Sequence, residues 1–366
     1  MFTAIMPALQ SSMQLSNQEV GLLVGALPMG YAALSYPASL ASGRVSERRI
    51  ILGGIMLTSI SVLLFSISRS FIAMFALSFL AGAGFSTYLP QAYSLLPRQY
   101  SSHQLGSVLG VHETGAPVGQ TLGPLFVWSA VGVLGWSGCL QAWIIFSLLV
   151  FILILLLVPE EKAVTQFSPK PTARKQLSPG LLIAMVATQA TVWSCNLGLL
   201  SMVPVYLTKT FLLDVSYVAF ILGLSRMTGA FGQLAGGYLS DKLGRTLVLF
   251  SSTVMVFLAT LWITLVPFNG FYVVGLFFQG IVSATFFPVF YATMSDITDY
   301  SNRAKMVGLT NSVAGFFGGA VAPATIGYLS DRFTFHTAFL FPMATGIVAC
   351  ATAFYVWKTT GSRHES

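Results

Sequence analysis

Eleven stretches of roughly 20 apolar residues follow one another along the chain, and they restrict the possible folds more than any other feature. A helix needs about 20 consecutive apolar residues to cross the hydrocarbon core of a bilayer. Residues 1–9 look like the end of one more stretch, and Ser16 with Glu19 forms a capping pattern at the start of the first full one. The sequence therefore predicts an all-α membrane protein with eleven full transmembrane helices. The predicted spans are 18–42, 50–68, 71–95, 106–130, 136–158, 181–208, 215–239, 246–267, 270–294, 305–329 and 336–357.

Charged residues are too few for a soluble fold. They make up 8% of the chain, whereas soluble domains carry about 25% charged residues. The net charge of +7 does not indicate a nucleic-acid partner, because the basic residues are spread over short loops and do not form one patch. We therefore expect an integral, multi-pass membrane protein that is surrounded by lipid.

The distribution of Lys and Arg predicts the orientation in the membrane. Fourteen of these residues lie in one set of alternate connections, while the other set holds only Arg69, Lys209 and Arg332. Cytoplasmic loops are enriched in Lys and Arg. We therefore place the first set of connections and the C-terminus on the cytoplasmic side of the cell membrane.

The two parts of the chain repeat each other at an offset of 198 residues. Phe79, Gly82, Thr87, Pro90 and Tyr93 recur as Phe277, Gly280, Thr285, Pro288 and Tyr291. Because this offset covers six crossings, both parts have the same orientation, as in transporters whose substrate binds between parallel halves. The predicted organisation is an N-terminal helical half at 1–158, a cytoplasmic linker at 159–180, a C-terminal helical half at 181–358 and a cytoplasmic tail at 359–366.

One connection carries a specific motif, Gly237-Tyr-Leu-Ser-Asp241-Lys242-Leu-Gly244-Arg245. It resembles the loop motif G-x-x-x-D-[RK]-x-G-[RK] of the major facilitator superfamily. A degraded copy in the first half keeps Gly43, Glu47 and Arg48, but Ile50 stands at the position of the second glycine. The resemblance covers the whole chain and implies that family's fold of two six-helix halves, here with most of helix 1 missing. It also implies that both copies form a cytoplasmic latch that breaks during transport.

The span at 106–130 contains a second, partial resemblance. Gly110, Gly119, Gly123 and Pro124 are similar to the antiporter motif of the same superfamily, although the terminal pair of glycines is absent. Gly115, Gly119 and Gly123 are also four residues apart, which gives a helix a smooth face for close packing. The sequence is compatible with an antiporter and with a packing surface alone.

Two ionisable residues lie well inside predicted spans, Glu113 in 106–130 and Arg226 in 215–239. Such residues are costly in lipid and are typical of functional sites. Arg226 lies near the membrane midplane, with Gln233 seven residues further on the same face. Arg226 can act as an anchor for an anionic substrate or in coupling, as the partner of Glu113, or as a structural residue bound to helix carbonyls.

The family resemblance further implies that the spans at 71–95, 181–208 and 270–294 line a central cavity. These spans contain polar and aromatic residues that suit the binding of a small molecule. The candidates for substrate binding are Tyr88, Gln91, Gln189, Trp193, Asn196, Gln279 and Tyr291.

The sequence contains no catalytic, metal-binding or cofactor-binding pattern, so we expect no enzyme and no cofactor. The favoured function is secondary transport of a small organic solute by alternating access. Proton-coupled efflux is considered first, because of the partial antiporter motif and Glu113, and uptake of an organic anion held by Arg226 second. A non-transporting membrane sensor or a truncated remnant is the alternative from another class, since half of one cavity wall is missing. We expect a monomer whose partners are a small-molecule substrate, lipid and, for efflux, protons.

The predicted orientation can be tested with a reporter enzyme that is active only outside the cytoplasm. Fused after Lys170, within the predicted linker, the reporter should be inactive because that segment is expected in the cytoplasm. Fused after Leu212, in one of the connections poor in Lys and Arg, it should be active. The reverse pattern of activity would overturn the orientation.

Overall fold

The computed structural model describes residues 1–41, 45–89, 91–92, 102–158, 178–298 and 300–361. Across these ranges the fold consists of helices, with no strand. The α-helices are α1 (Phe2–Met13), α2 (Asn17–Ala41), α3 (Glu47–Ile67), α4 (Phe71–Phe85), α6 (Ser102–Leu157), α7 (Pro179–Trp193), α8 (Leu199–Thr210), α9 (Val215–Met227), α10 (Gly229–Leu243), α11 (Arg245–Leu265), α12 (Gly270–Ile297), α13 (Tyr300–Ala314), α14 (Ala322–Arg332) and α15 (Phe335–Gly361). Two π-helical segments, η1 (Ser194–Gly198) and η2 (Gly315–Val321), join α7 to α8 and α13 to α14. Most of the predicted linker and the end of the tail lie outside the described residues.

The number of membrane crossings agrees with the sequence. In the described part of the chain, nine helical segments are long and apolar enough to span a bilayer, and Phe71–Phe85 is a shorter apolar helix. One of the nine, Gly115–Leu157, contains a break at Gly135, where φ is 63°. Counting its two arms separately and adding α4 gives the eleven crossings that were predicted. The predicted capping pattern is also present, because Glu19 Oε2 accepts from Ser16 N at 2.8 Å and Ser16 Oγ accepts from Glu19 N at 3.1 Å.

Several crossings are interrupted where a straight helix was expected. The span predicted at 71–95 ends its first helix at Phe85, and the Thr87 hydroxyl donates to the Gly84 carbonyl at 2.9 Å. Such local hydrogen bonds compete with the helical ladder. The span at 215–239 breaks between α9 and α10 at Thr228, whose hydroxyl donates to the Phe277 carbonyl on α12 at 3.0 Å. Both interruptions lie inside predicted spans.

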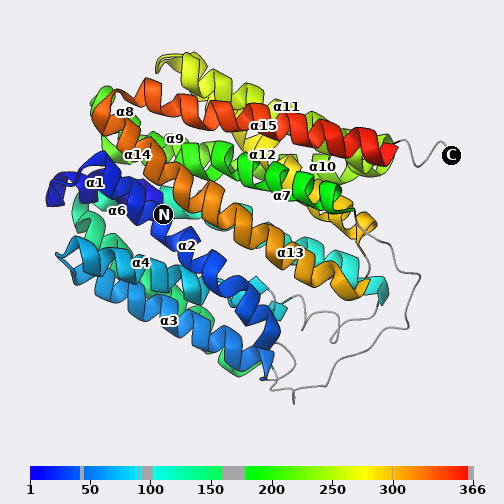
Figure 1. The fold of residues 1–366 in the computed structure, drawn as a ribbon. Coiled ribbons are helices and arrows are strands. Elements are labelled where there is room, and N and C mark those ends of the chain that lie inside the picture. Colours follow the sequence, from blue (N-terminus) through cyan, green and yellow to red (C-terminus); the bar gives the residue numbers. More distant parts are fainter. Residues whose placement is uncertain (42–44, 90, 93–101, 159–177, 299, 362–366) are drawn as a thin grey trace.

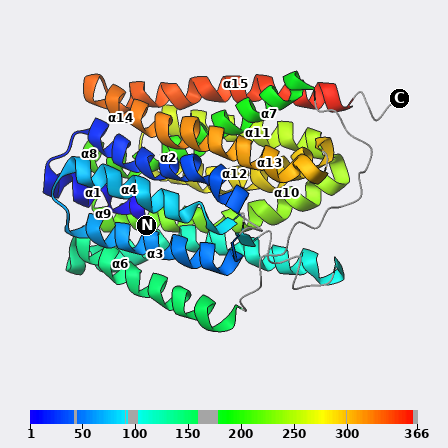
Figure 2. The same ribbon diagram turned by 60° about the horizontal axis from the view of Figure 1, so that its bottom comes forward.

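The helices run side by side along one direction and form two groups (Figure 1). The first half, coloured blue through cyan to blue-green, lies beside the second half, coloured green to red, and α2 contacts α13, η2 and α14 of the second half. Figure 2 shows the same bundle turned about the horizontal axis. We name the two ends of the bundle by their charges. The basic end carries Arg48, Arg49, Lys242, Arg245 and Lys358, and the opposite end carries Arg69, Lys209 and Arg332.

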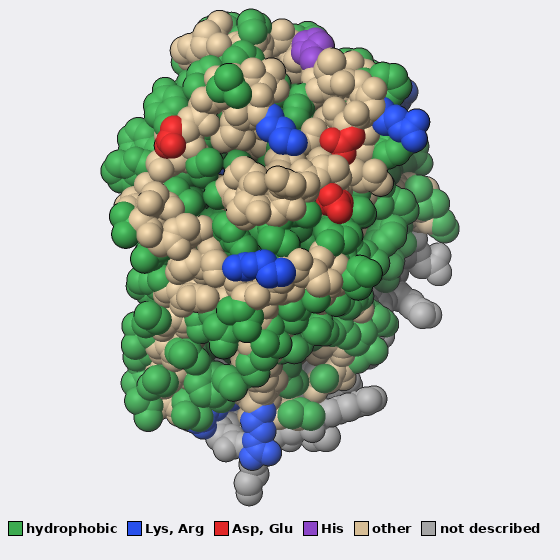
Figure 3. All heavy atoms as spheres, turned by 90° about the vertical axis from the view of Figure 1, so that its left-hand side faces the viewer, with side chains coloured by type: hydrophobic (Ala, Val, Ile, Leu, Met, Phe, Trp, Pro, Cys, Tyr) green, Lys and Arg blue, Asp and Glu red, His purple; other side chains and the backbone are tan. Residues whose placement is uncertain are grey.

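Hydrophobic side chains cover most of the surface that Figure 3 shows, and charged side chains are few. This view faces the opposite end of the bundle. On α6, Ile145, Leu156 and Leu157 are 69%, 73% and 74% exposed. Apolar side chains so exposed on a long helix are in contact with lipid in a membrane protein.

Close contacts between helix backbones fix the packing inside each half. A Cβ atom at Gly82 on α4 would collide with the carbonyl of Leu27 on α2, and a Cβ atom at Gly280 on α12 would collide with the carbonyl of Ser225 on α9. Both the glycines and their contact residues are related by the same offset of 198 residues. The repeat seen in the sequence therefore corresponds to a repeated helix–helix contact.

Candidate functional site

Arg226 lies at the centre of a polar cluster in the second half. Its Nη2 donates to Gln279 Oε1 on α12 at 2.8 Å, and Gln279 Nε2 donates to Asn196 Oδ1 in η1 at 3.1 Å. Gln279 and Asn196 are buried. Three residues that were singled out separately as binding candidates are thus joined in one chain of hydrogen bonds.

The cluster lies near the middle of the membrane-spanning segments. Arg226 is 11 residues from Val215 and 17 from Leu243, the ends of its span. It is two residues from the break at Thr228, and Asn196 belongs to a π-helical segment, a kind of irregularity that is frequent at functional sites. Arg226 thus lies in the last turn of α9, and Asn196 lies in a π-helical segment.

The positive charge of Arg226 is not balanced by the described side chains. The ion pairs among them involve Asp241, Asp296 and Arg245, at the basic end. An arginine in the middle of a membrane helix costs roughly 2.5–3.5 kcal/mol on insertion scales, and one neutral amide oxygen does not remove the charge. The side chain of Glu113 lies outside the described residues, so its pairing with Arg226 stays a prediction.

A second polar cluster lies on the side of the basic end. Gln189 Nε2 on α7 and the hydroxyl of Tyr291 on α12 both donate to Asn311 Oδ1 on α13, at 2.7 and 2.8 Å. Gln189 and Asn196 are seven residues apart on one helix face, or about 10 Å along the axis. Asn311 was not among the predicted residues. The signal that could have identified it is an amide inside an otherwise apolar span.

Several polar atoms near the second cluster are buried without a hydrogen-bond partner. They are Gln189 Oε1, Trp193 Nε1 and Ser312 Oγ. A Cβ atom at Gly315, one turn after Asn311, would lie 3.8 Å from the Trp193 ring, so these groups belong to one region. Buried polar atoms are nearly always satisfied. Together they offer an acceptor and donors to a polar molecule in this region.

The candidates in the first half have different surroundings. Tyr88 OH is 2.9 Å from His112 Nε2, and the two rings stack with centroids 5.6 Å apart. Gln91 was expected to line the cavity, but it is fully buried and its Nε2 donates to the Ala38 carbonyl on α2 at 2.8 Å. Gln91 therefore makes a helix–helix contact. Gln233 is half-buried on α10, beyond the break at Thr228.

Comparison with known proteins identifies the family. A sequence model of the Major Facilitator Superfamily matches residues 1–269 and 182–366. The chain belongs to the major facilitator superfamily. It is similar to the hexuronate transporter of Bacillus subtilis, with 24% identity over 94% of this chain and 87% of that protein. It is also similar to the glycerol-3-phosphate transporter of the same organism, with 22% identity over 100% of this chain and 89% of that protein.

A solved structure shows the same fold. It is a bacterial homolog of the human lysosomal transporter Spinster in an inward-facing and occupied conformation. Its TM-score is 0.84 at 17% identity, over 98% of this chain and 92% of that one. The family and the fold are those of multi-pass membrane transporters for small solutes, as predicted.

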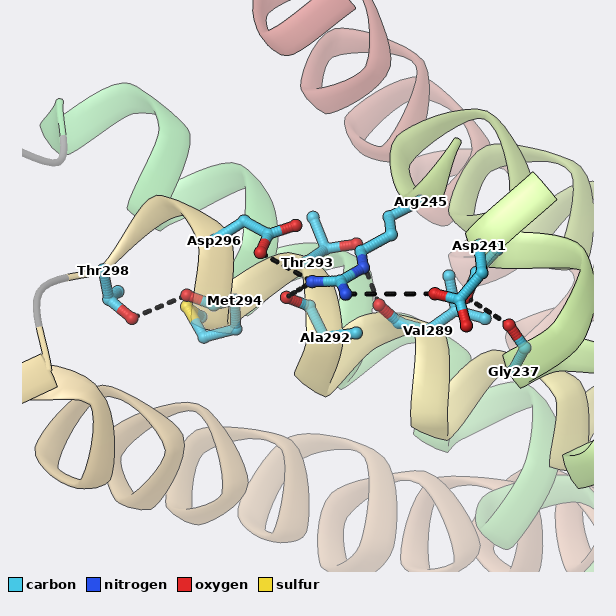
Figure 4. Close-up of polar contacts among 10 residues, drawn as sticks. Gly237, Asp241, Arg245, Val289, Ala292, Thr293, Met294, Asp296 and Thr298 are labelled. Atoms are coloured by element: carbon cyan, nitrogen blue, oxygen red, sulfur yellow. Dashed lines mark hydrogen bonds and ion pairs between the residues drawn. The ribbon is translucent and has the colours of Figure 1, made fainter. Parts of the chain in front are cut away.

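The superfamily loop motif lies at the basic end, between α10 and α11 (Figure 4). Arg245 Nη1 is 2.6 Å from Asp296 Oδ1 at the end of α12, and Arg245 Nη2 is 3.9 Å from Asp241 Oδ1. Lys242 Nζ lies 4.5 Å from the centre of the Tyr238 ring. These contacts stay within the second half. Asp296, the nearest partner of Arg245, was missed because no motif includes it.

The first-half copy of the superfamily motif has a different local structure. Glu47 is the first residue of α3 and is buried, whereas Asp241 lies in the last turn of α10 and is exposed. The two carboxylates therefore occupy different positions on their helices, and the role of Glu47 in a latch stays a prediction. Arg48 Nη2 donates to the Leu155 carbonyl at the end of α6. Gly43 lies outside the described residues.

The helix face formed by Gly115, Gly119 and Gly123 on α6 is closely packed only at Gly123. A Cβ atom at Gly123 would lie 2.7 Å from the nitrogen of Met1, and Pro124 is buried. A Cβ atom at Gly115 or Gly119 would have no atom within 4 Å. The close packing predicted for Gly115 and Gly119 is thus absent in this structure, since open space lies next to them.

Replacing Gly244 by alanine should destabilise the superfamily loop. Gly244 has φ 92° and ψ 132°, a conformation that costs other residues on the order of 1–3 kcal/mol. Gly237→Ala is the matched control, because Gly237 is helical and its Cβ would have no atom within 4 Å. Thermal unfolding of the purified variants in detergent should show a lower midpoint only for Gly244→Ala. Equal midpoints for the two variants would contradict this role of Gly244.

Proposed function

We propose that this protein is a secondary transporter of small organic anions and that Arg226 binds the anionic group. The observation that carries the proposal is the position of Arg226. It lies near the middle of its span, bonded to a neutral amide, and the described acidic side chains leave its charge unbalanced. A guanidinium presents up to five N–H donors in a planar fork that suits a carboxylate or a phosphate. One of these donors is hydrogen-bonded to Gln279, which orients the guanidinium group.

The second polar cluster supports binding of hydroxyl groups on the same solute. A hydroxyl can donate to Gln189 Oε1 and accept from Trp193 Nε1, both of which are buried without a partner. The cluster is about 10 Å from Asn196 along the helix, which is the length scale of a molecule with several carbon atoms. Hexuronate and glycerol-3-phosphate, named for two relatives, are both hydroxylated organic anions.

The charge at the site supports transport by alternating access. A bound anion neutralises Arg226, so the halves can close around a site that carries less net charge into the membrane interior. Two hydrogen bonds, from Arg226 to Gln279 and from Gln279 to Asn196, join α9, α12 and η1. They hold the Arg226 side chain in place while the halves move. Direction of transport and coupling to protons stay predictions, as does the proton-coupled efflux suggested by the glycines of α6.

A non-transporting sensor is the competing function. It would bind the same anions through Arg226, but it would not move them across a membrane. Uptake of a radiolabelled anion into liposomes that contain the purified protein separates the two functions. Binding with no flux above that of empty liposomes would favour the sensor.

Replacing Arg226 by glutamine should weaken anion binding about ten- to hundredfold, because a hydrogen bond to a charged group contributes roughly 1.5–3 kcal/mol. Arg226→Lys should retain part of the affinity, since it keeps the charge and loses the fork. The measurement is the ligand-induced rise in unfolding temperature with a panel of hydroxylated carboxylates and phosphates.

The matched control is Arg69→Gln, the same substitution at the opposite end, where Arg69 lies 5.4 Å from the Trp136 ring centre. It should bind anions normally. Unchanged affinity in a folded Arg226→Gln variant, for every anion that the parent protein binds, would exclude Arg226 as the anchor.

Asn311→Leu should weaken binding of hydroxylated anions by about three- to tenfold and should leave binding of their deoxy analogues unchanged. The substitution removes the acceptor for Gln189 and Tyr291, and a neutral hydrogen bond contributes roughly 0.5–1.5 kcal/mol. Gln141→Leu is the control, because Gln141 also bonds across helices, to Ser66 at 3.3 Å, but lies in the first half. An equal loss for both kinds of anion would argue against hydroxyl recognition by this cluster.

A further inference from the structure

A six-residue pattern of the superfamily loop occurs a second time, at the other end of the molecule. Gly237-Tyr-Leu-Ser-Asp241-Lys242 ends α10 at the basic end, and Gly327-Tyr-Leu-Ser-Asp331-Arg332 ends α14 at the opposite end. In both copies the basic side chain lies over the tyrosine ring, at 4.5 Å for Lys242 and at 5.3 Å for Arg332. The two copies are therefore similar in local structure as well as in sequence.

In the opposite-end copy, Asp331 caps a helix of the other half. Its Oδ1 accepts from Asn17 N at 3.0 Å and its Oδ2 accepts from Gln18 N at 2.6 Å, at the start of α2. The first N–H groups of a helix have no partner within the helix, and a carboxylate there is favoured by the helix dipole. Ser16 and Glu19 satisfy two further N–H groups of the same turn. Asp331 thus completes the cap of α2 from across the interface between the halves.

A second bridge strengthens this contact. Lys209 Nζ, at the end of α8, donates to Asn17 Oδ1 at 2.8 Å, and Gln10 Nε2 on α1 donates to the same oxygen at 2.9 Å. Asn17 therefore receives hydrogen bonds from both halves. We use the name opposite-end clasp for Asp331, Lys209, Asn17 and Gln18.

The clasp lies where the halves are closest. A Cβ atom at Gly25 on α2 would lie 2.6 Å from the Ala320 carbonyl, and one at Gly21 would collide with the Pro323 carbonyl. Toward the basic end the spacing grows, because a Cβ atom at Gly315 would lie 3.3 Å from Ala32 and one at Gly308 would lie 3.8 Å from Tyr36.

The pair formed by α6 and α9 gives another contact between the halves. A Cβ atom at Gly223 on α9 would lie 2.9 Å from Leu125 on α6. The halves are thus in contact at the opposite end and further apart toward the basic end.

We propose that Asp331 and its clasp hold the opposite end closed in this state. This inference rests on the proposed alternating-access function. In the present structure Asp331 is engaged across the halves, while the Asp241 side chain is 73% exposed and lies 3.9 Å from Arg245 of its own half. In this structure the opposite-end copy of the pattern therefore joins the halves, whereas the described contacts of the basic-end copy stay within the second half.

Hydrogen–deuterium exchange of the ligand-free protein in nanodiscs tests the proposal. Asp331→Ala should speed exchange at the start of α2 and the end of α14 about three- to thirtyfold, as expected for the loss of a helix cap. If the clasp controls the state of the transporter, exchange at the basic end, in α13 and the end of α10, should become slower at the same time. Asp241→Ala should leave the opposite end protected, because it disables only the basic-end contact.

Asp214→Ala is the matched control. Asp214 also caps a helix at the opposite end, since its Oδ1 accepts from Ser216 N and Tyr217 N at 2.8 and 3.2 Å, but it does so within the second half. This variant should change exchange only at the start of α9. If Asp331→Ala behaves in the same local way, with no slowing at the basic end, Asp331 is only a helix cap and the proposal is overturned.

A uniform rise in exchange would indicate that the variant is unstable. Asp331→Asn, which keeps an acceptor and removes the charge, then decides the matter by the same criterion, and a uniform rise in both variants overturns the proposal. Exchange is measured without substrate, so a failure of anion binding by Arg226 leaves this result intact. Conversely, if Asp331→Ala binds anions normally but shows no slower exchange at the basic end, the proposal for the clasp is still overturned.

Discussion

In the part of the chain that the structure describes, several helix backbones approach each other closely at glycines. In lipid the hydrophobic effect does not hold helices together, so packing and interhelical hydrogen bonds must do so. Gly82 against Leu27 and Gly280 against Ser225 provide this contact in each half. Between the halves the comparable contact, at Gly25, is found toward the opposite end. Rigid halves that touch tightly at one end are the arrangement on which alternating access depends.

The polar groups of the second half are held by hydrogen bonds between helices. Gln279 orients Arg226 and Asn196 orients Gln279, so three helical elements set the direction of the charged group. The break at Thr228 and the π-helical segment η1 lie directly beside these side chains. An organic anion bound here would thus meet a preorganised site, which reduces the loss of side-chain freedom on binding.

The sequence predicted most crossings to within a few residues, although the first helix of the span at 71–95 ends at Phe85. It also predicted Arg226, Gln279 and Asn196 as candidates, although not their contact. It missed Asn311 and Asp331, because their partners Gln189 and Asn17 are 122 and 314 residues away in the chain. Gln91 was placed in the cavity because its helix was expected there. The rotation of the helix turns it instead toward α2.

The sequence alone determined the fold class, the crossings, the tandem repeat and the family motif. Each of these depends only on hydropathy, charge or residue spacing along the chain. The tertiary structure decided which polar residues meet, and that the halves are joined by Asp331 at the opposite end while Arg245 at the basic end pairs within its own half. The physical reason is that a buried polar group is satisfied by whichever partner the helix packing brings near. That partner depends on the distances between helices and on their rotation, which no local pattern specifies.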